Sequence, residues 1–200
     1  MIDAVTPPSV VLYTFADRLE PRPPDDAALA QLLIAVAAWA LAEQDTIDLA
    51  PLPHPRPVDG RLAFNRLRAY APQPGLEGRL LHSMTGKGKE TRGISVLALL
   101  TIGLPVGFET EARHDSLRYA IETGPWRTRR PHRAVLRICG EEARRAGATR
   151  RFGRGPRADR LPELEINFAE VRSRWQRFQS QHPELHAALM DDCAAGLRPD

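Results

Sequence analysis

The longest uncharged run of the chain lies between Ala27 and Ala42 and consists mainly of alanine and leucine. Both residues are strong helix formers. Asp25 and Asp26 stand at its start, where acidic side chains cap the N–H groups of a helix and favour the positive end of its dipole. The large apolar residues point nearly all the way round the helix axis, which is typical of a helix covered on several sides. We therefore expect a buried central helix over residues 26–44.

A membrane span is the alternative interpretation of this run. Its 16 residues, at about 1.5 Å per residue, cover roughly 24 Å, whereas the hydrocarbon core of a bilayer is about 30 Å thick. Gln31 interrupts the run, and half of its residues are alanine. We therefore expect no transmembrane segment. Because Met1 is followed by Ile2 and Asp3 rather than by basic residues, we also expect no signal peptide.

A small β-hairpin is predicted directly after the central helix. Apolar and polar positions alternate over residues 46–50, as in a half-buried strand. The prolines of residues 51–57 cannot hold a sheet ladder and predict a loop. Residues 61–70 are then expected to pair with the first strand, with Leu62 and Phe64 on one face.

Further helices are predicted where apolar residues recur at helical spacing. They are expected over residues 75–84, over 94–102, over 131–147, after a cap formed by Asn167 and Glu170, and from Pro183 to Gly196. The last two are expected to form an αα-hairpin. Residues 9–15 and 117–121 fit either a strand or a helix, and residues 148–160 are expected to form a mobile basic loop.

These elements together predict a mainly α fold, a compact helical domain around the buried helix 26–44 with a small β-hairpin and a C-terminal αα-hairpin. Residues 1–160 would form the helical domain, and residues 161–200 would pack on it within one domain overall. Two hundred residues, of which 42% are apolar, suffice for one hydrophobic core. Cys139 and Cys193 have no CxxC partner, which favours buried free thiols and a reducing cytoplasm.

The charge is distributed unevenly, although the formal net charge is only +3. Residues 1–60 hold nine acidic residues and three arginines, a net charge of −6. Residues 127–160 hold twelve arginines and three acidic residues, a net charge of +9. Such a cluster predicts an anion-binding surface, since the planar guanidinium fork matches phosphate oxygens. The residues expected to bind anions are Arg127, Arg129, Arg130, Arg133, Arg137, Arg144, Arg150, Arg151 and Arg154.

Other motifs give little indication of catalysis. The segment Gly86-Lys87-Gly88-Lys89 lacks the spacing of a Walker A loop. His182 and His186 share helical spacing but do not form an HExxH motif. The adjacent residues His114-Asp115-Ser116 differ from a catalytic triad, whose members converge from separate segments. We therefore expect no enzyme activity, no catalytic residues, no metal site and no cofactor.

The Ala/Leu-rich run from Ala30 to Ala42 is followed directly by Glu43-Gln44-Asp45-Thr46-Ile47-Asp48-Leu49. This stretch resembles the Ala/Leu-rich helix and the short strand after it in bacterial relatives of the Golgi phosphoprotein 3 family (GPP34 domain). Pro74-Gly75-Leu76-Glu77 with Leu80-Leu81, and Arg137 to Gly147, are looser matches. The family's tryptophan before this helix is missing, because Trp39 lies inside it. The resemblance implies a mostly helical, peripheral membrane module that binds anionic lipid headgroups, and no lipid-contacting residue carries over.

Three kinds of partner remain open for the arginine-rich region. A cytoplasmic, membrane-peripheral module docking on anionic lipid would present Arg127, Arg129, Arg130, Arg150 and Arg151 on one exposed face. A nucleic-acid-associated protein would make non-specific phosphate contacts with the same face. Trp126 and Phe152, which flank the region, would enter the lipid interface or stack on bases. In an adaptor, the arginines would meet an acidic protein or the acidic N-terminal third, within one chain or across a homo-oligomer.

Overall fold

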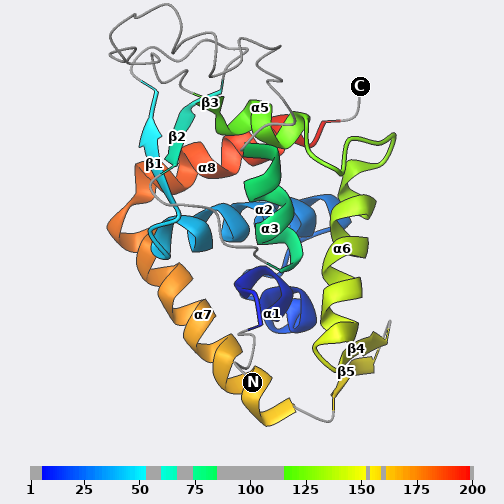
Figure 1. Cartoon of the computed structure of the whole chain (residues 1–200). Helices are drawn as coiled ribbons and strands as arrows, with labels where there is room; N and C mark the ends of the chain where they lie inside the picture. Colours follow the sequence, from blue (N-terminus) through cyan, green and yellow to red (C-terminus); the bar gives the residue numbers. More distant parts are fainter. Residues whose placement is uncertain are drawn as a thin grey trace, which may run out of the picture.

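The computed structural model describes residues 6–52, 60–66, 74–84, 115–151, 154–158 and 161–198. The described residues form a mainly helical protein with small antiparallel sheets, as the sequence predicts (Figure 1). The helices are α1 (Pro8–Thr14), the 3-10 turn η1 (Ala16–Arg18), α2 (Asp26–Glu43), α3 (Gly75–Met84), α5 (Leu117–Glu122), α6 (Pro131–Arg145), α7 (Leu161–Gln181) and α8 (Pro183–Gly196). The strands are β1 (Ile47–Pro51), β2 (Leu62–Arg66), β3 (Asp115–Ser116), β4 (Ala148–Arg151) and β5 (Arg154–Ala158).

Helix α2 is the buried centre of the fold, which confirms the prediction for residues 26–44. Asp25 caps it by accepting a hydrogen bond of 2.8 Å from the N–H of Ala28. Every residue from Leu33 to Leu41 is buried, because α1, α3, α6 and α8 pack around the helix. The helix is also long and apolar enough to cross a membrane, and 61% of that apolar window is buried inside the structure. Its apolar surface is thus largely covered by protein.

The hairpin predicted after α2 is present as β1 and β2, which pair antiparallel with Leu49 opposite Phe64. Leu62 and Phe64 are both buried, as expected for neighbours on one face. The two-residue strand β3 extends the sheet by pairing Ser116 with Ala63. The sequence did not predict this third strand.

The two segments that fit either a strand or a helix by their periodicity are both helical in the structure. Residues 9–15 fall largely in α1, where Pro8 occupies the first turn, a position proline favours because it needs no N–H partner there. Residues 117–121 lie in α5, which the side chain of Ser116 caps by accepting from the N–H of Tyr119 at 3.3 Å. Helix α1 is buried on most of its surface, and α5 buries the side that carries Leu117, Ala120 and Ile121.

The prediction of a mobile loop at residues 148–160 is wrong, because β4 and β5 form an antiparallel hairpin there. Ala148 pairs with Ala158, and Arg151 pairs with Arg154. Pairing in this hairpin is between backbones, and the arginine-rich sequence shows no apolar alternation that would have revealed it.

The C-terminal αα-hairpin of α7 and α8 is confirmed, but the predicted start of α7 is wrong. The helix begins at Leu161, so Asn167 lies inside it and does not cap it. Pro162, in the first turn of α7, indicates the start of this helix better than Asn167 does, because proline is favoured at the first helical positions. Phe168 and Trp175 are buried, as expected from their spacing. The helix predicted over residues 94–102 lies outside the described residues.

Candidate anion-docking surface

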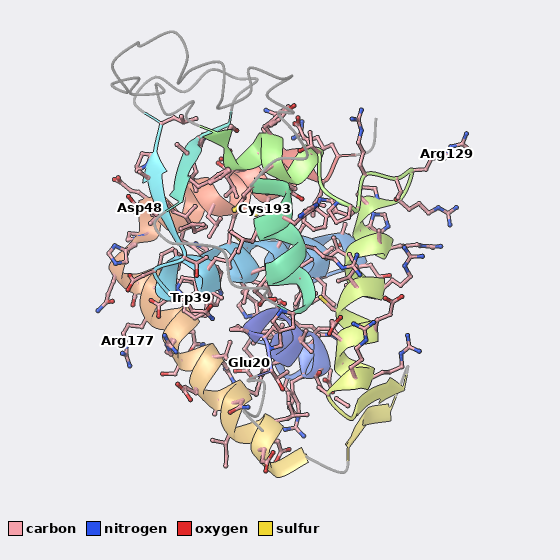
Figure 2. All side chains as sticks on the ribbon, in the orientation of Figure 1. Glu20, Trp39, Asp48, Arg129, Arg177 and Cys193 are labelled. Carbon is pink, nitrogen blue, oxygen red and sulfur yellow. The ribbon has the colours of Figure 1, made fainter. Side chains whose placement is uncertain are left out.

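Helix α6 divides into a buried apolar face and an exposed basic face. Its buried face packs toward α1 and α2, and the buried residues are Pro131, Ala134, Val135, Ile138, Cys139 and Ala143. Arg133, Arg137 and Arg144 are exposed and share one side, since offsets of four and eleven residues return to nearly the same angle on a helix. Figure 2 shows nitrogen-tipped side chains projecting outward along this helix. The amphipathic helix predicted at residues 131–147 is therefore confirmed.

The arginines expected to bind anions lie along the whole length of α6. Arg127, Arg129 and Arg130 are exposed in the segment before its first turn, and Arg129 points away from the body of the protein (Figure 2). Arg150 and Arg151 lie in β4 and Arg154 lies in β5, beyond the other end of the helix; their side chains are outside the described part of the chain. The 15 residues of α6 separate the two groups by about 22 Å. The described arginines thus form an elongated strip.

Trp126 does not belong to this exposed strip, contrary to the role expected for it. Its side chain is buried, with 1% of its surface exposed. The indole N–H donates a hydrogen bond of 2.7 Å to the carbonyl oxygen of Ile121. A Cβ atom at Gly124 would lie 2.5 Å from the indole ring, so the backbone needs glycine at this close approach. Trp126 therefore anchors the segment that carries the arginines, and it cannot stack on bases or enter lipid from this position.

Backbone hydrogen bonds hold the same segment in place. The N–H of Arg127 donates to the carbonyl of Gly124 at 3.0 Å. The N–H of Arg130 donates to the hydroxyl of Thr128 at 3.2 Å. Pro131 then begins α6 with its fixed φ, which suits the first helical position. The exposed arginine side chains are thus carried on a hydrogen-bonded backbone segment.

Positive charge concentrates at the N-terminal end of α6. Arg129 and Arg130 precede the helix, Arg133 lies in its first turn, and that turn contains no acidic residue. The helix dipole is also positive at this end, so the arrangement costs stability and strengthens the attraction for anions. The acidic residues of the helix lie near its other end, where Glu141 is 4.0 Å from Arg137 and Glu142 pairs with Arg145.

Two acidic residues of the N-terminal third, Glu20 and Glu43, form ion pairs with α7 rather than with this surface. Glu20 lies 3.1 Å from Arg172, and Glu43 pairs with Arg174. Figure 1 shows α7 and α6 on opposite sides of α1. These ion pairs therefore leave the basic face of α6 to solvent.

A hollow of about 420 Å³ adjoins the N-terminal end of the strip. Arg118, Tyr119, Arg127, Thr128 and Arg198 contribute to its lining. Tyr119 is 63% exposed, and Arg118 pairs with Glu122 at 2.7 Å. Sequence reasoning missed Arg118, Tyr119 and Arg198, because the packing of α5 against α8 brings together segments that are far apart in the chain.

Two buried carboxyl groups lie away from the strip and hold backbone segments together. Glu77 accepts hydrogen bonds from the N–H of Ser9 at 2.9 Å and from its hydroxyl at 2.7 Å. Burial raises the pKa of Glu77, although these hydrogen bonds oppose the shift. Asp192 accepts from the N–H groups of Arg61 and Leu62, and burial raises its pKa as well. Their contacts indicate structural roles at α1 and β2.

Both cysteines are buried free thiols, as the sequence predicts. Burial raises the pKa of Cys139 and Cys193 well above the ordinary value, so neither is poised as a thiolate nucleophile. Within the described ranges, no group of three or more His, Cys, Asp or Glu side chains could hold a metal ion.

Comparison with protein-family models, with curated proteins and with solved structures finds no match to this chain. The resemblance to the GPP34 family therefore stays a prediction.

Proposed function

We propose that this chain is a non-enzymatic, peripheral module that docks on an anionic lipid surface through the basic strip, defined here as Arg127, Arg129, Arg130, Arg133, Arg137 and Arg144. The observation that carries the proposal is the exposed group Arg129, Arg130 and Arg133 at the positive end of α6, where the first turn offers no acidic residue. Positive side chains at the positive end of the helix dipole destabilise the helix and strengthen the binding of an external anion.

The shape and surroundings of the strip favour a lipid surface among the anionic partners. Exposed arginines along the outer side of one helix can meet a flat surface together, and each contributes about 1 kcal/mol near an anionic leaflet. The exposed ring of Tyr119 lies beside the N-terminal end of the strip, and tyrosine is favoured at membrane–water interfaces. Buried free thiols are consistent with the cytoplasmic leaflet as the target.

The other two kinds of partner have less support. Trp126 is buried, so it can neither stack on bases nor enter lipid, and the exposed ring that adjoins the strip is that of Tyr119. Glu20 and Glu43 already pair with α7, so they do not supply the acidic surface that an internal contact would need. Nucleic acid and an acidic protein are therefore treated as outcomes of the test.

The test is sedimentation with vesicles of phosphatidylcholine alone and with about 30 mol% phosphatidylserine, at about 50 mM and 300 mM salt. We expect pelleting with the anionic vesicles only, and its loss at high salt because exposed charges are screened. Duplex DNA is added as a competitor. Release of the protein from the vesicles at a low molar excess of DNA would indicate that the basic strip binds nucleic acid instead. If the protein binds neither vesicles nor DNA, an acidic protein remains as the partner.

A further inference from the structure

A second hollow, of about 320 Å³, lies between α1, α2, α7, α8 and the proline-rich segment before α2. This volume is at the lower end of the range for small-molecule sites. Much of its lining is aliphatic and aromatic, from Leu12, Leu19, Leu32, Trp175 and Met190. Leu32 and Met190 are only partly buried, so apolar surface remains open toward the hollow. None of its lining residues belongs to the basic strip.

The polar groups of this hollow have an excess of positive charge. Arg22, Arg172 and Glu20 contribute two guanidinium groups and one carboxylate. Arg172 is 33% exposed and pairs at 3.1 Å with Glu20, which is 81% exposed. Such an exposed ion pair contributes little to stability and exchanges readily with other ions.

Three neutral polar side chains, Gln176, Gln179 and His186, complete the lining. The amide nitrogen of Gln179 lies 3.1 Å from Nε2 of His186. Burial lowers the pKa of His186, so its imidazole is mainly neutral at pH 7. The hollow thus combines an apolar wall with two guanidinium groups, of which Arg172 is engaged by the carboxylate of Glu20.

We infer that this hollow binds a medium-chain monocarboxylate, with the alkyl chain against the leucines and the ligand carboxylate in the place of Glu20 on Arg172. At about 30 Å³ per water-sized group, the volume holds roughly ten such groups, which suits a chain of eight to ten carbons. A carboxylate matches the bidentate donor geometry of arginine. This site is independent of the vesicle docking proposed above, since it uses other residues.

The test is isothermal titration calorimetry of the full chain with decanoate below its micelle concentration, with decanol as the uncharged comparison. We expect saturable binding of decanoate, and binding of decanol at least tenfold weaker. Arg172→Gln is expected to weaken decanoate binding at least tenfold. Glu20→Gln is expected to strengthen it severalfold, because the competing carboxylate is removed.

A matched pair of variants separates binding in the hollow from adsorption elsewhere. Ala28 lines the hollow, whereas its exposed neighbour Ala27 does not. Ala28→Trp is expected to fill the hollow and abolish binding, and Ala27→Trp is expected to bind as the original chain does. Far-UV circular dichroism verifies that each variant is folded. No saturable binding of decanoate, equal binding of decanol, or unchanged binding by Ala28→Trp would each overturn the inference.

Discussion

The indole N–H of Trp126 donates a 2.7 Å hydrogen bond to the carbonyl oxygen of Ile121, the last buried residue of α5. This contact ties the segment before α6 to the preceding helix. Arg127 follows the tryptophan directly, and Arg129 and Arg130 come within four positions of it. The aromatic residue of the arginine-rich region therefore acts inside the fold, where it sets the position of the charges outside.

Replacing Trp126 by phenylalanine should cost more stability than the same change at Trp39. Both side chains are buried, but the N–H of Trp126 donates a hydrogen bond to Ile121, whereas that of Trp39 has no partner within the described part of the chain. Trp126→Phe loses a bond worth about 1 kcal/mol, whereas Trp39→Phe removes an unsatisfied donor. Urea unfolding measures the two free energies. A larger loss for Trp39→Phe would contradict the anchoring role.

The stability contributed by Glu77 should fall with rising pH. Burial raises the folded-state pKa of Glu77 above its ordinary value of 4.5, so the folded chain holds this proton more tightly than the unfolded chain. The stability that protonated Glu77 contributes is fully present at pH values below the pKa of this residue in the unfolded chain. It is lost as the pH rises through the pKa of Glu77 in the folded chain. Glu77→Gln stays neutral, so its stability relative to the original chain should increase as pH rises above 4.5.

Chemical denaturation at a series of pH values gives this difference directly. Glu184→Gln, at an exposed position on α8, is the control for removing one acidic residue. A difference for Glu77→Gln that is flat or decreases with pH would show that the buried carboxyl is not the source of the slope.

Alanine should be far less tolerated at Gly60 than at Gly147. Both glycines have positive φ, 83° and 78°, a conformation that costs an L-residue about 1–2 kcal/mol. A Cβ atom at Gly60 would also lie 2.7 Å from Oδ1 of Asp192, whereas one at Gly147 meets nothing within 4 Å. Overpacking of this kind adds about 1–3 kcal/mol. Equal losses of unfolding free energy in the two variants would show that Asp192 does not fix the start of β2.

The sequence was sufficient for the elements whose apolar residues follow a regular spacing. Helix α2 was predicted from a long uncharged run with an aspartate cap, and α6 was predicted from the contrast between its Val135 face and its Arg133 face. The hairpin of β4 and β5 was missed because its residues carry charge without alternation. The short strand β3 was missed because a two-residue strand has no period to detect.

The candidate surface was predictable in charge but not in arrangement. Clustering of arginine in residues 127–160 identified the region, and the structure shows the described arginines along one helix and its preceding segment. The burial of Trp126 could not be predicted, since an aromatic residue beside arginines fits both an exposed and a buried position. Arg198 and Tyr119 were missed because only the packing of α5 on α8 brings them to the strip.

The most direct test of docking through the basic strip compares Arg133→Glu with Arg177→Glu in the anionic vesicle assay. Both residues are exposed on helices, and Figure 2 shows Arg177 on the side of the molecule opposite Arg129. The two variants carry the same net charge. Reversing one charge at the membrane should cost about 2 kcal/mol, or roughly a 30-fold lower partition coefficient, for Arg133→Glu. We expect Arg177→Glu to bind almost as the original chain does, and equal losses in the two variants would contradict docking through α6.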